Sequence, residues 1–204
     1  MMVGPEKLAY EQAAGFFVAT VEQVRPEQWD SPGLDRWSVR DLAGHTGRAL
    51  LTVETYLGQP ASAVEVETPG DYFVAALAGT GGPDQIAQRG REAGAALGPD
   101  PASAVREIAA RVLGLVATAD DARLLSTPVG GMRLRAYLPT RTFELVVHTL
   151  DLAVALGVPA EPPPEPARLS LQIAAELTLR SGRGAEVLLA LTGRRPLPDG
   201  FSVV

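Results

Sequence analysis

The sequence LPTRTFELVVHTLDLAVAL, residues 138–156, has the most regular helical pattern in the chain. Pro139 stands at an early helical position, where its missing N–H costs little, and Gly157 and Pro159 follow the last apolar residue. Apolar side chains cover nearly the whole circumference of this predicted helix, which indicates that it is buried on most sides. These side chains are Phe143, Leu145, Val146, Val147, Leu150, Leu152, Val154 and Leu156.

Two polar residues interrupt this apolar helix. Glu144 and His148 are four positions apart, so they share one face of the helix, and Asp151 lies on that face as well. A carboxylate inside an apolar core is costly unless it is paired or binds a metal. The pattern therefore indicates either an ion pair between Glu144 and His148 or a metal site to which both contribute.

A second helix is predicted from a cap at Ser38 to about Leu57. Asp41, three residues after Ser38, completes a pattern typical of a capping box. His45 lies two turns into this helix, where it is either a hydrogen-bonded core histidine or a metal ligand. Because the chain has two histidines and no cysteine, a metal site must combine them with carboxylates. His45 together with Glu144 and the second histidine would suit catalytic zinc or non-haem iron(II).

Two more long helices are predicted from apolar stripes at residues 8–24 and 102–117. Strand-like alternation is scarce, so the sequence predicts an all-α fold, a four-helix bundle. Residues 84–97 also have a helical pattern, but Gly90 and Gly94 within it predict loose packing.

The remaining segments are predicted to be less regular. Residues 1–158 are expected to form the bundle domain, and residues 159–204 a proline-rich linker with a short C-terminal helical extension. The smaller predictions are a loop at 59–83 with a short helical turn at 72–77, an extended segment at 127–137, the linker at 161–166, a helix near 167–179 and an apolar segment at 185–191.

The composition excludes several kinds of protein. The hydrophobic fraction is 46% and the charged fraction 21%, as in ordinary globular proteins, and no apolar run reaches the roughly 18 residues that cross a bilayer. We see no signal peptide and expect a cytoplasmic protein without a membrane partner. The net charge of −6 argues against a nucleic-acid partner. Because cysteine is absent, any thiol chemistry must use a thiol from outside the chain.

Two segments resemble the mycothiol-dependent maleylpyruvate isomerase family. Residues 37–45, WSVRDLAGH, are similar to its signature W-[ST]-V-R-D-L-x-x-H. Residues 137–152, YLPTRTFELVVHTLDL, are similar to its second signature, where an arginine precedes E-L-x-x-H and an Asp follows. The family belongs to the DinB-like superfamily of helical bundles, which carry one metal ligand on the second helix and two on the fourth. The resemblance covers roughly residues 8–157.

This resemblance implies a metal centre and a cosubstrate. It assigns His45, Glu144 and His148 as ligands, zinc as the usual metal, and mycothiol as the thiol that attacks an electrophilic carbon. The isomerase that gives the family its name has a second, sterol-carrier-like domain with a catalytic arginine. Residues 167–204 of this chain are too few to form that domain in full. We therefore expect mycothiol S-transfer to a small electrophile, or an isomerase-like reaction, rather than maleylpyruvate isomerisation itself. DinB-like proteins are often dimers, so a homodimer is a further expectation by analogy.

Two arginines are candidates for catalytic contacts. Arg48 follows His45 by three residues, and Arg141 precedes Glu144 by three, so both can point toward the metal. Each either binds a carboxylate of the substrate or thiol, or lies on a solvated face or pairs with a local acid.

The same ligand set is compatible with two other functions. One is a metal-dependent hydrolase that uses metal-bound water as its nucleophile. The other is a stress protein that binds a metal and a ligand without catalysis.

Overall fold

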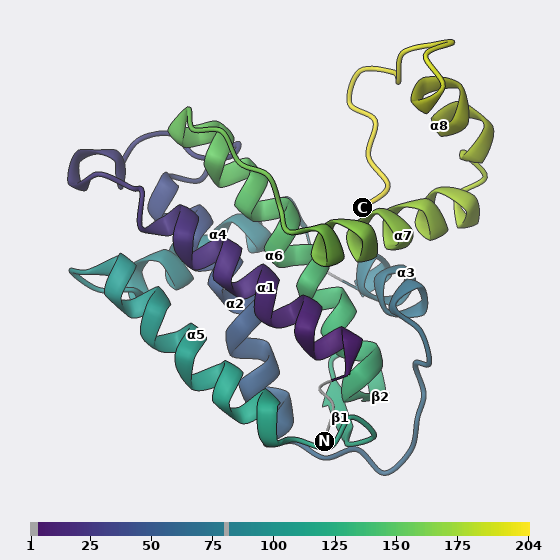
Figure 1. Ribbon diagram of the computed structural model, residues 1–204, viewed down its shortest axis with the longest axis horizontal. Helices are drawn as coiled ribbons and strands as arrows, with labels where there is room; N and C mark the ends of the chain where they lie inside the picture. The colour runs from purple at the N-terminus through teal and green to yellow at the C-terminus, as the bar shows by residue number, and fades with distance from the viewer. Residues whose placement is uncertain (1–3, 80–81) are drawn as a thin grey trace.

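A computed structural model describes residues 4–79 and 82–204. Residues 1–3, and residues 80–81 within the predicted loop 59–83, lie outside the described part. The described chain is mostly helical and contains one small antiparallel sheet (Figure 1). Its elements are α1 (Pro5–Val21), η1 (Pro26–Gln28), α2 (Val39–Leu57), α3 (Pro69–Gly79), α4 (Pro83–Ala96), α5 (Pro101–Thr118), β1 (Leu124–Thr127), β2 (Gly130–Arg133), α6 (Leu134–Leu156), α7 (Pro164–Arg180) and α8 (Gly184–Leu191).

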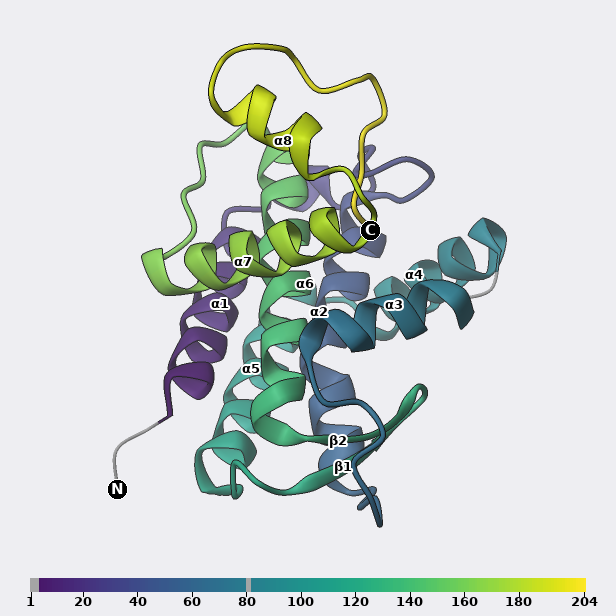
Figure 2. The same cartoon turned by 90° about the vertical axis from the view of Figure 1, so that its right-hand side faces the viewer.

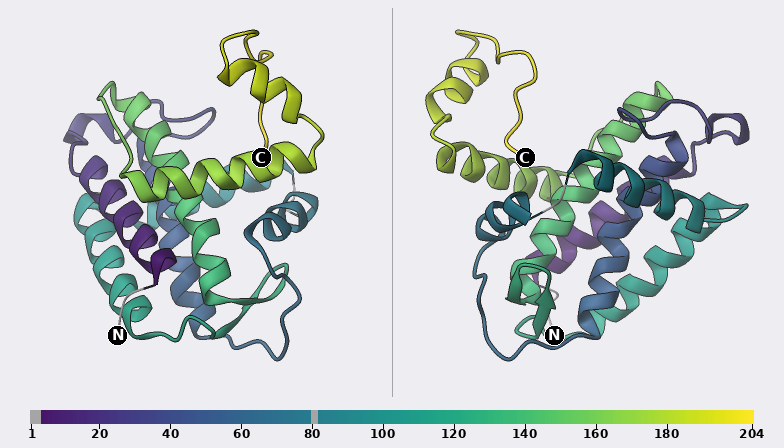
Figure 3. Two further views of the ribbon diagram at one scale, coloured as in Figure 1. Left: turned by 45° about the vertical axis from the view of Figure 1, so that its right-hand side comes forward. Right: turned by 180° about the vertical axis from the view of Figure 1, so that it is seen from behind.

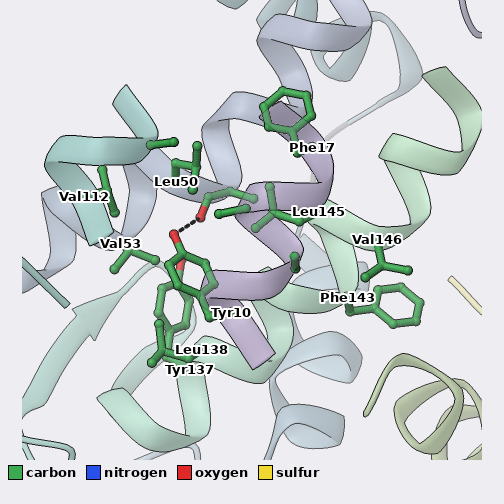
Figure 4. Close-up of a cluster of buried hydrophobic side chains, with 14 of the residues drawn as sticks. Tyr10, Phe17, Leu50, Val53, Val112, Tyr137, Leu138, Phe143, Leu145 and Val146 are labelled. Carbon is green, nitrogen blue, oxygen red and sulfur yellow. Dashed lines mark hydrogen bonds between the residues drawn. The ribbon is translucent and has the colours of Figure 1, made fainter. Parts of the chain in front are cut away.

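Four long helices, α1, α2, α5 and α6, form a bundle, which confirms the predicted all-α, DinB-like fold. Helix α6 packs against both α1 and α2, and α5 packs against the same two helices from another side (Figures 1 and 3). The core between them is apolar, with Phe17, Leu50 and Leu145 fully buried (Figure 4). Tyr10 is also buried, and its hydroxyl donates a hydrogen bond of 3.2 Å to the carbonyl oxygen of Ala49.

Helix α2 begins where the sequence predicts. The Ser38 hydroxyl accepts a hydrogen bond from the backbone N–H of Asp41, and the Asp41 carboxylate accepts one from the N–H of Ser38. This capping box satisfies backbone donors that the first turn of a helix leaves without partners. The start of the helix, and with it the position of His45 two turns later, is therefore fixed locally.

Helix α6 is longer than its sequence pattern predicts. The extended segment ends at Arg133, and the helix already begins at Leu134, so the prediction of extended backbone up to residue 137 is wrong. Leu134 and Leu138 are four positions apart and both fully buried, so core packing favours a helix there. Pro139 thus lies in the second turn, where it removes one backbone hydrogen bond.

Helix α4 packs tightly against α2, so the predicted loose packing is wrong. A Cβ atom on Gly44 of α2 would lie 2.3 Å from the backbone nitrogen of Gly94 on α4. A Cβ atom on Gly90 would lie 2.2 Å from Nε1 of Trp37. The glycines lower the helix propensity of α4, but they allow the two helices to approach more closely than side chains would permit.

The C-terminal region lies across the bundle. Helix α7 packs against α6, α1 and α3, while α8 contacts α7 and stands away from the bundle (Figures 1 and 2). The predicted short turn at 72–77 is the longer helix α3, and α7 begins within the predicted linker because proline fits the first helical turn. The last residues return toward the bundle, where Val203 packs against the core. No helix of the described residues has the length and apolarity to cross a membrane.

Candidate metal centre

Three side chains from α2 and α6 converge in the structure. His45 comes from α2, and Glu144 and His148 come from successive turns of α6. One nitrogen or oxygen atom from each lies within 4.8 Å of the others, and this is the one such group of His and acidic residues in the part of the chain that the structure describes. The two imidazole rings are 4.9 Å apart, centroid to centroid, and nearly perpendicular.

His148 is held between two carboxylates. Its Nε2 lies 3.3 Å from Oε2 of Glu144, and its Nδ1 lies 3.0 Å from Oδ2 of Asp151. Burial lowers the pKa of His148, but the hydrogen bonds to Asp151 and Glu144 outweigh it and raise the pKa to about 9. Burial raises the pKa of Glu144, but its hydrogen bond from His148 and the charge of Arg141 lower it to about 2. Without a metal, His148 is therefore cationic at neutral pH.

His45 has a different environment. Burial and the charge of His148 lower its pKa to about 4, so the ring is neutral at pH 7. Its Nδ1 is buried and has no hydrogen-bond partner among the described residues, an arrangement that costs free energy. The ring of Trp37 packs against it, 4.3 Å away between centroids. A neutral imidazole, a carboxylate and a second imidazole fit the donor set of a divalent metal.

A cavity of about 470 Å³ opens at this cluster, and His45 and Glu144 form part of its wall. Glu144 keeps 26% of its side chain exposed, so it faces this cavity instead of a dry core. Tyr72 and Phe73 of α3 form an aromatic side of the cavity, and Val204 lies at its edge. The volume is typical of a site for a small molecule.

The family assignment follows from a comparison with protein-family models. The model described as "Mycothiol maleylpyruvate isomerase N-terminal domain" matches residues 10–153, which is most of the chain. The chain belongs to this family. The family is part of the DinB-like superfamily and places the chain among mycothiol-related, metal-binding domains. No curated protein and no solved structure matches the chain.

Arg48 and Arg141 both line the cavity. The Arg141 guanidinium lies over the rings of Tyr72 and Tyr137, at 5.1 and 5.2 Å from their centroids. Its Nε donates a 3.0 Å hydrogen bond to the hydroxyl of Thr140. Neither arginine forms a short ion pair with an acidic side chain of the described residues, although the charge of Arg141 lowers the pKa of Glu144.

No motif in the sequence indicated several of the residues that line the cavity. Arg89 on α4 lines the same cavity and adds a third guanidinium to it. Arg89 reaches the cavity because α4 packs closely against α2. The glycines in the sequence of α4 predicted loose packing instead. Tyr72 and Val204 reach the cavity from segments far apart in the chain, and no local spacing indicates it. Asp151, which the sequence places on the same helix face as Glu144 and His148, contacts His148.

Proposed function

We propose that this domain binds zinc through His45, Glu144 and His148 and transfers the sulfur of mycothiol to a small electrophile. The observation that carries the proposal is the convergence of the three donor atoms within 4.8 Å at the wall of a cavity. When bound, a divalent metal lowers the pKa of a coordinated thiol and so supplies a thiolate at neutral pH. The membership in a mycothiol-related, metal-binding family supports this chemistry.

The protein's own residues prepare the ligands. His45 is neutral at pH 7 and offers a nitrogen without losing a proton, whereas His148 must lose one. Asp151 accepts the hydrogen bond of His148 Nδ1 and so directs Nε2 toward Glu144. A carboxylate partner of this kind fixes the tautomer of a metal-ligating histidine and increases its basicity.

We further propose that Arg48 and Arg141 bind an anionic group of the substrate. Both line the cavity beside Glu144, and neither forms a short ion pair with an acidic side chain of the described residues. A guanidinium binds a carboxylate through two parallel hydrogen bonds, which would orient the electrophilic carbon relative to the thiol.

The thiol must come from outside the protein, because the chain contains no cysteine. The cavity accommodates a small electrophile, with Tyr72 and Phe73 as its aromatic wall. Attack of the thiolate on the electrophilic carbon forms one S–C bond. In a displacement, the bond to the leaving group breaks and that group departs with the electron pair. In an addition, the π bond breaks and the neighbouring carbon takes up a proton from water.

The test combines metal analysis with a thiol-transfer assay. Elemental mass spectrometry should find one zinc per chain in the wild type and little in His45→Ala and His148→Ala. Glu54→Gln removes the ion pair between Glu54 on α2 and Arg111 on α5; it is the control and should retain the metal. Mycothiol should consume a model electrophile with the wild type but not with His148→Ala.

Other outcomes select the alternatives. Absence of metal, even after incubation with zinc or iron(II), would show that Glu144 and His148 are a structural ion pair. Turnover without any added thiol would favour the metal-dependent hydrolase. Tight binding of electrophiles without turnover would favour a non-catalytic binding protein.

A further inference from the structure

The two histidines of the cluster are held by different means. His148 has a carboxylate on each ring nitrogen, whereas Nδ1 of His45 has no hydrogen-bond partner among the described residues. The torsion that turns an imidazole ring about its Cβ–Cγ bond has broad energy wells. Without a hydrogen bond at Nδ1, the orientation of His45 must be restricted by packing.

Trp37 supplies that packing. Its ring lies 4.3 Å from the His45 ring, centroid to centroid, with an angle of 32° between the planes. The His148 ring stands nearly perpendicular to His45, at 4.9 Å. Trp37 precedes the capped start of α2, so it reaches His45 from outside the helix that carries this histidine.

Helix α4 in turn holds Trp37 in place. The indole Nε1 donates a hydrogen bond of 3.0 Å to the carbonyl oxygen of Ala87, and the side chain is only 9% exposed. Gly90 leaves the space that the indole occupies, since a Cβ atom there would lie 2.2 Å from Nε1. The position of the indole is therefore set by α4, and through it the position of the His45 ring.

We propose that Trp37 is a positioning residue that fixes the ring of His45 and thereby sets the affinity and geometry of the metal centre. The inference rests on the proposed function, because it concerns the same metal ligands. Residues that orient metal ligands contribute about 10- to 100-fold to metal affinity when their contact is a hydrogen bond. Trp37 achieves the same restriction by a tilted ring-to-ring contact, and Nδ1 of His45 has no hydrogen-bond partner among the described residues.

The first experiment compares Trp37→Leu with Trp29→Leu. Trp29 is a matched control because it is 8% exposed and belongs to the same core, but its ring contacts Arg40 and no proposed ligand. Zinc dissociation constants are measured by chelator competition, and the visible absorption spectrum of the cobalt(II)-substituted protein reports the coordination geometry. We expect Trp37→Leu to raise the zinc dissociation constant about 10- to 100-fold and to change the cobalt spectrum. Trp29→Leu should leave both unchanged.

Two further variants separate positioning from general loss of core packing. Trp37→Phe keeps an aromatic ring but loses the hydrogen bond to Ala87, so its zinc affinity should fall between those of the wild type and Trp37→Leu. Gly90→Ala displaces the indole without removing it and should weaken zinc binding in the same direction. If Trp37→Leu does not fold, the zinc affinities of Trp37→Phe and Gly90→Ala test the positioning role in its place.

A measurement on the metal-free protein keeps this inference distinct from the proposed function. Because the chain has two histidines, histidine-selective isotope labelling gives NMR ring signals from two residues only. The His45 ring should have one orientation in the wild type and in Trp29→Leu, and an averaged orientation in Trp37→Leu.

A fixed ring in Trp37→Leu would overturn the positioning role, even if the wild type binds zinc. Equal loss of zinc affinity in Trp29→Leu would overturn it as well. If the wild type binds no metal, the proposed function fails, and the ring dynamics alone still decide whether Trp37 positions His45.

Discussion

The Nδ1 atom of His148 lies 3.0 Å from the carboxylate of Asp151, which is nearly one turn further along α6. The contact leaves Nε2 of the same ring to face Glu144. One side chain thus determines which nitrogen of His148 is directed toward the proposed metal, since a ring N–H at Nδ1 needs an acceptor.

Replacing Asp151 by asparagine should weaken zinc binding about 10- to 100-fold, because the neutral amide supports the His148 tautomer less well than a carboxylate. Competition with a chromogenic chelator measures the change, and Glu54→Gln on α2 is the control for an acid outside the cluster. Unchanged affinity in Asp151→Asn would show that the contact with His148 does not support the metal centre.

The stability of the metal-free protein should fall at high pH. His148 has a pKa of about 9 in the folded chain against about 6.5 in an unfolded one, so folding raises this pKa. The stabilisation is fully present below pH 6.5 and is lost as the pH rises through 9, with a size on the order of 1–3 kcal/mol. Urea unfolding of chelator-treated protein at pH 6, 7.5 and 9.5 measures it. His148→Gln should remove this part of the pH dependence, and parallel curves for the two proteins would contradict the prediction.

Arg141 should determine the preference for anionic substrates. We expect Arg141→Gln to lower kcat/KM for a carboxylate-bearing maleimide about tenfold or more, since a charge-assisted hydrogen bond contributes roughly 1.5–3 kcal/mol. For a maleimide without a charged group, the same substitution should lower kcat/KM much less. Arg106→Gln is the matched control, because Arg106 lies on α5 in an exposed pair with Glu22. Equal losses for both maleimides would exclude Arg141 as the anion-binding residue.

Replacing two glycines of α2 by alanine, one at a time, should change the free energy of unfolding in opposite directions. Gly44→Ala places a Cβ atom 2.3 Å from the backbone of Gly94 and should lower the free energy of unfolding by about 1–3 kcal/mol. Gly47→Ala meets no atom within 4 Å and should raise it by about 0.5–1 kcal/mol, because alanine favours the helix. Denaturant titrations of both variants test the close approach of α4 to α2, and equal effects would contradict it.

The features predicted correctly from the sequence depend on short spacings. The capping box at Ser38 and Asp41 involves four consecutive residues, and the shared face of Glu144 and His148 involves one helical turn. These spacings predicted the start of α2 and the shared face on α6, apolar periodicity predicted the all-α bundle, and the resemblance to a known family joined His45 to Glu144 and His148. Their role as metal ligands remains a prediction.

The features that were missed depend on contacts between distant segments. The glycines of α4 favour loose packing by propensity, yet Gly94 lies directly against α2, and this contact brings Arg89 to the cavity. The early start of α6 depends on burial of Leu134 in a core to which several helices contribute. Neither arrangement can be read from residues near in sequence.

Val204 lies at the edge of the cavity that His45 and Glu144 line, and this position affects how the protein should be prepared. Any residues joined to Val204, whether native or appended, begin at the cavity that two of the proposed metal ligands line. A polyhistidine purification tag fused there would bring additional imidazoles next to a chain that has two of its own. Zinc counted on such a fusion could belong to the tag, and the tag could occlude the substrate. An affinity tag placed ahead of α1 and cleaved before metal analysis avoids both effects.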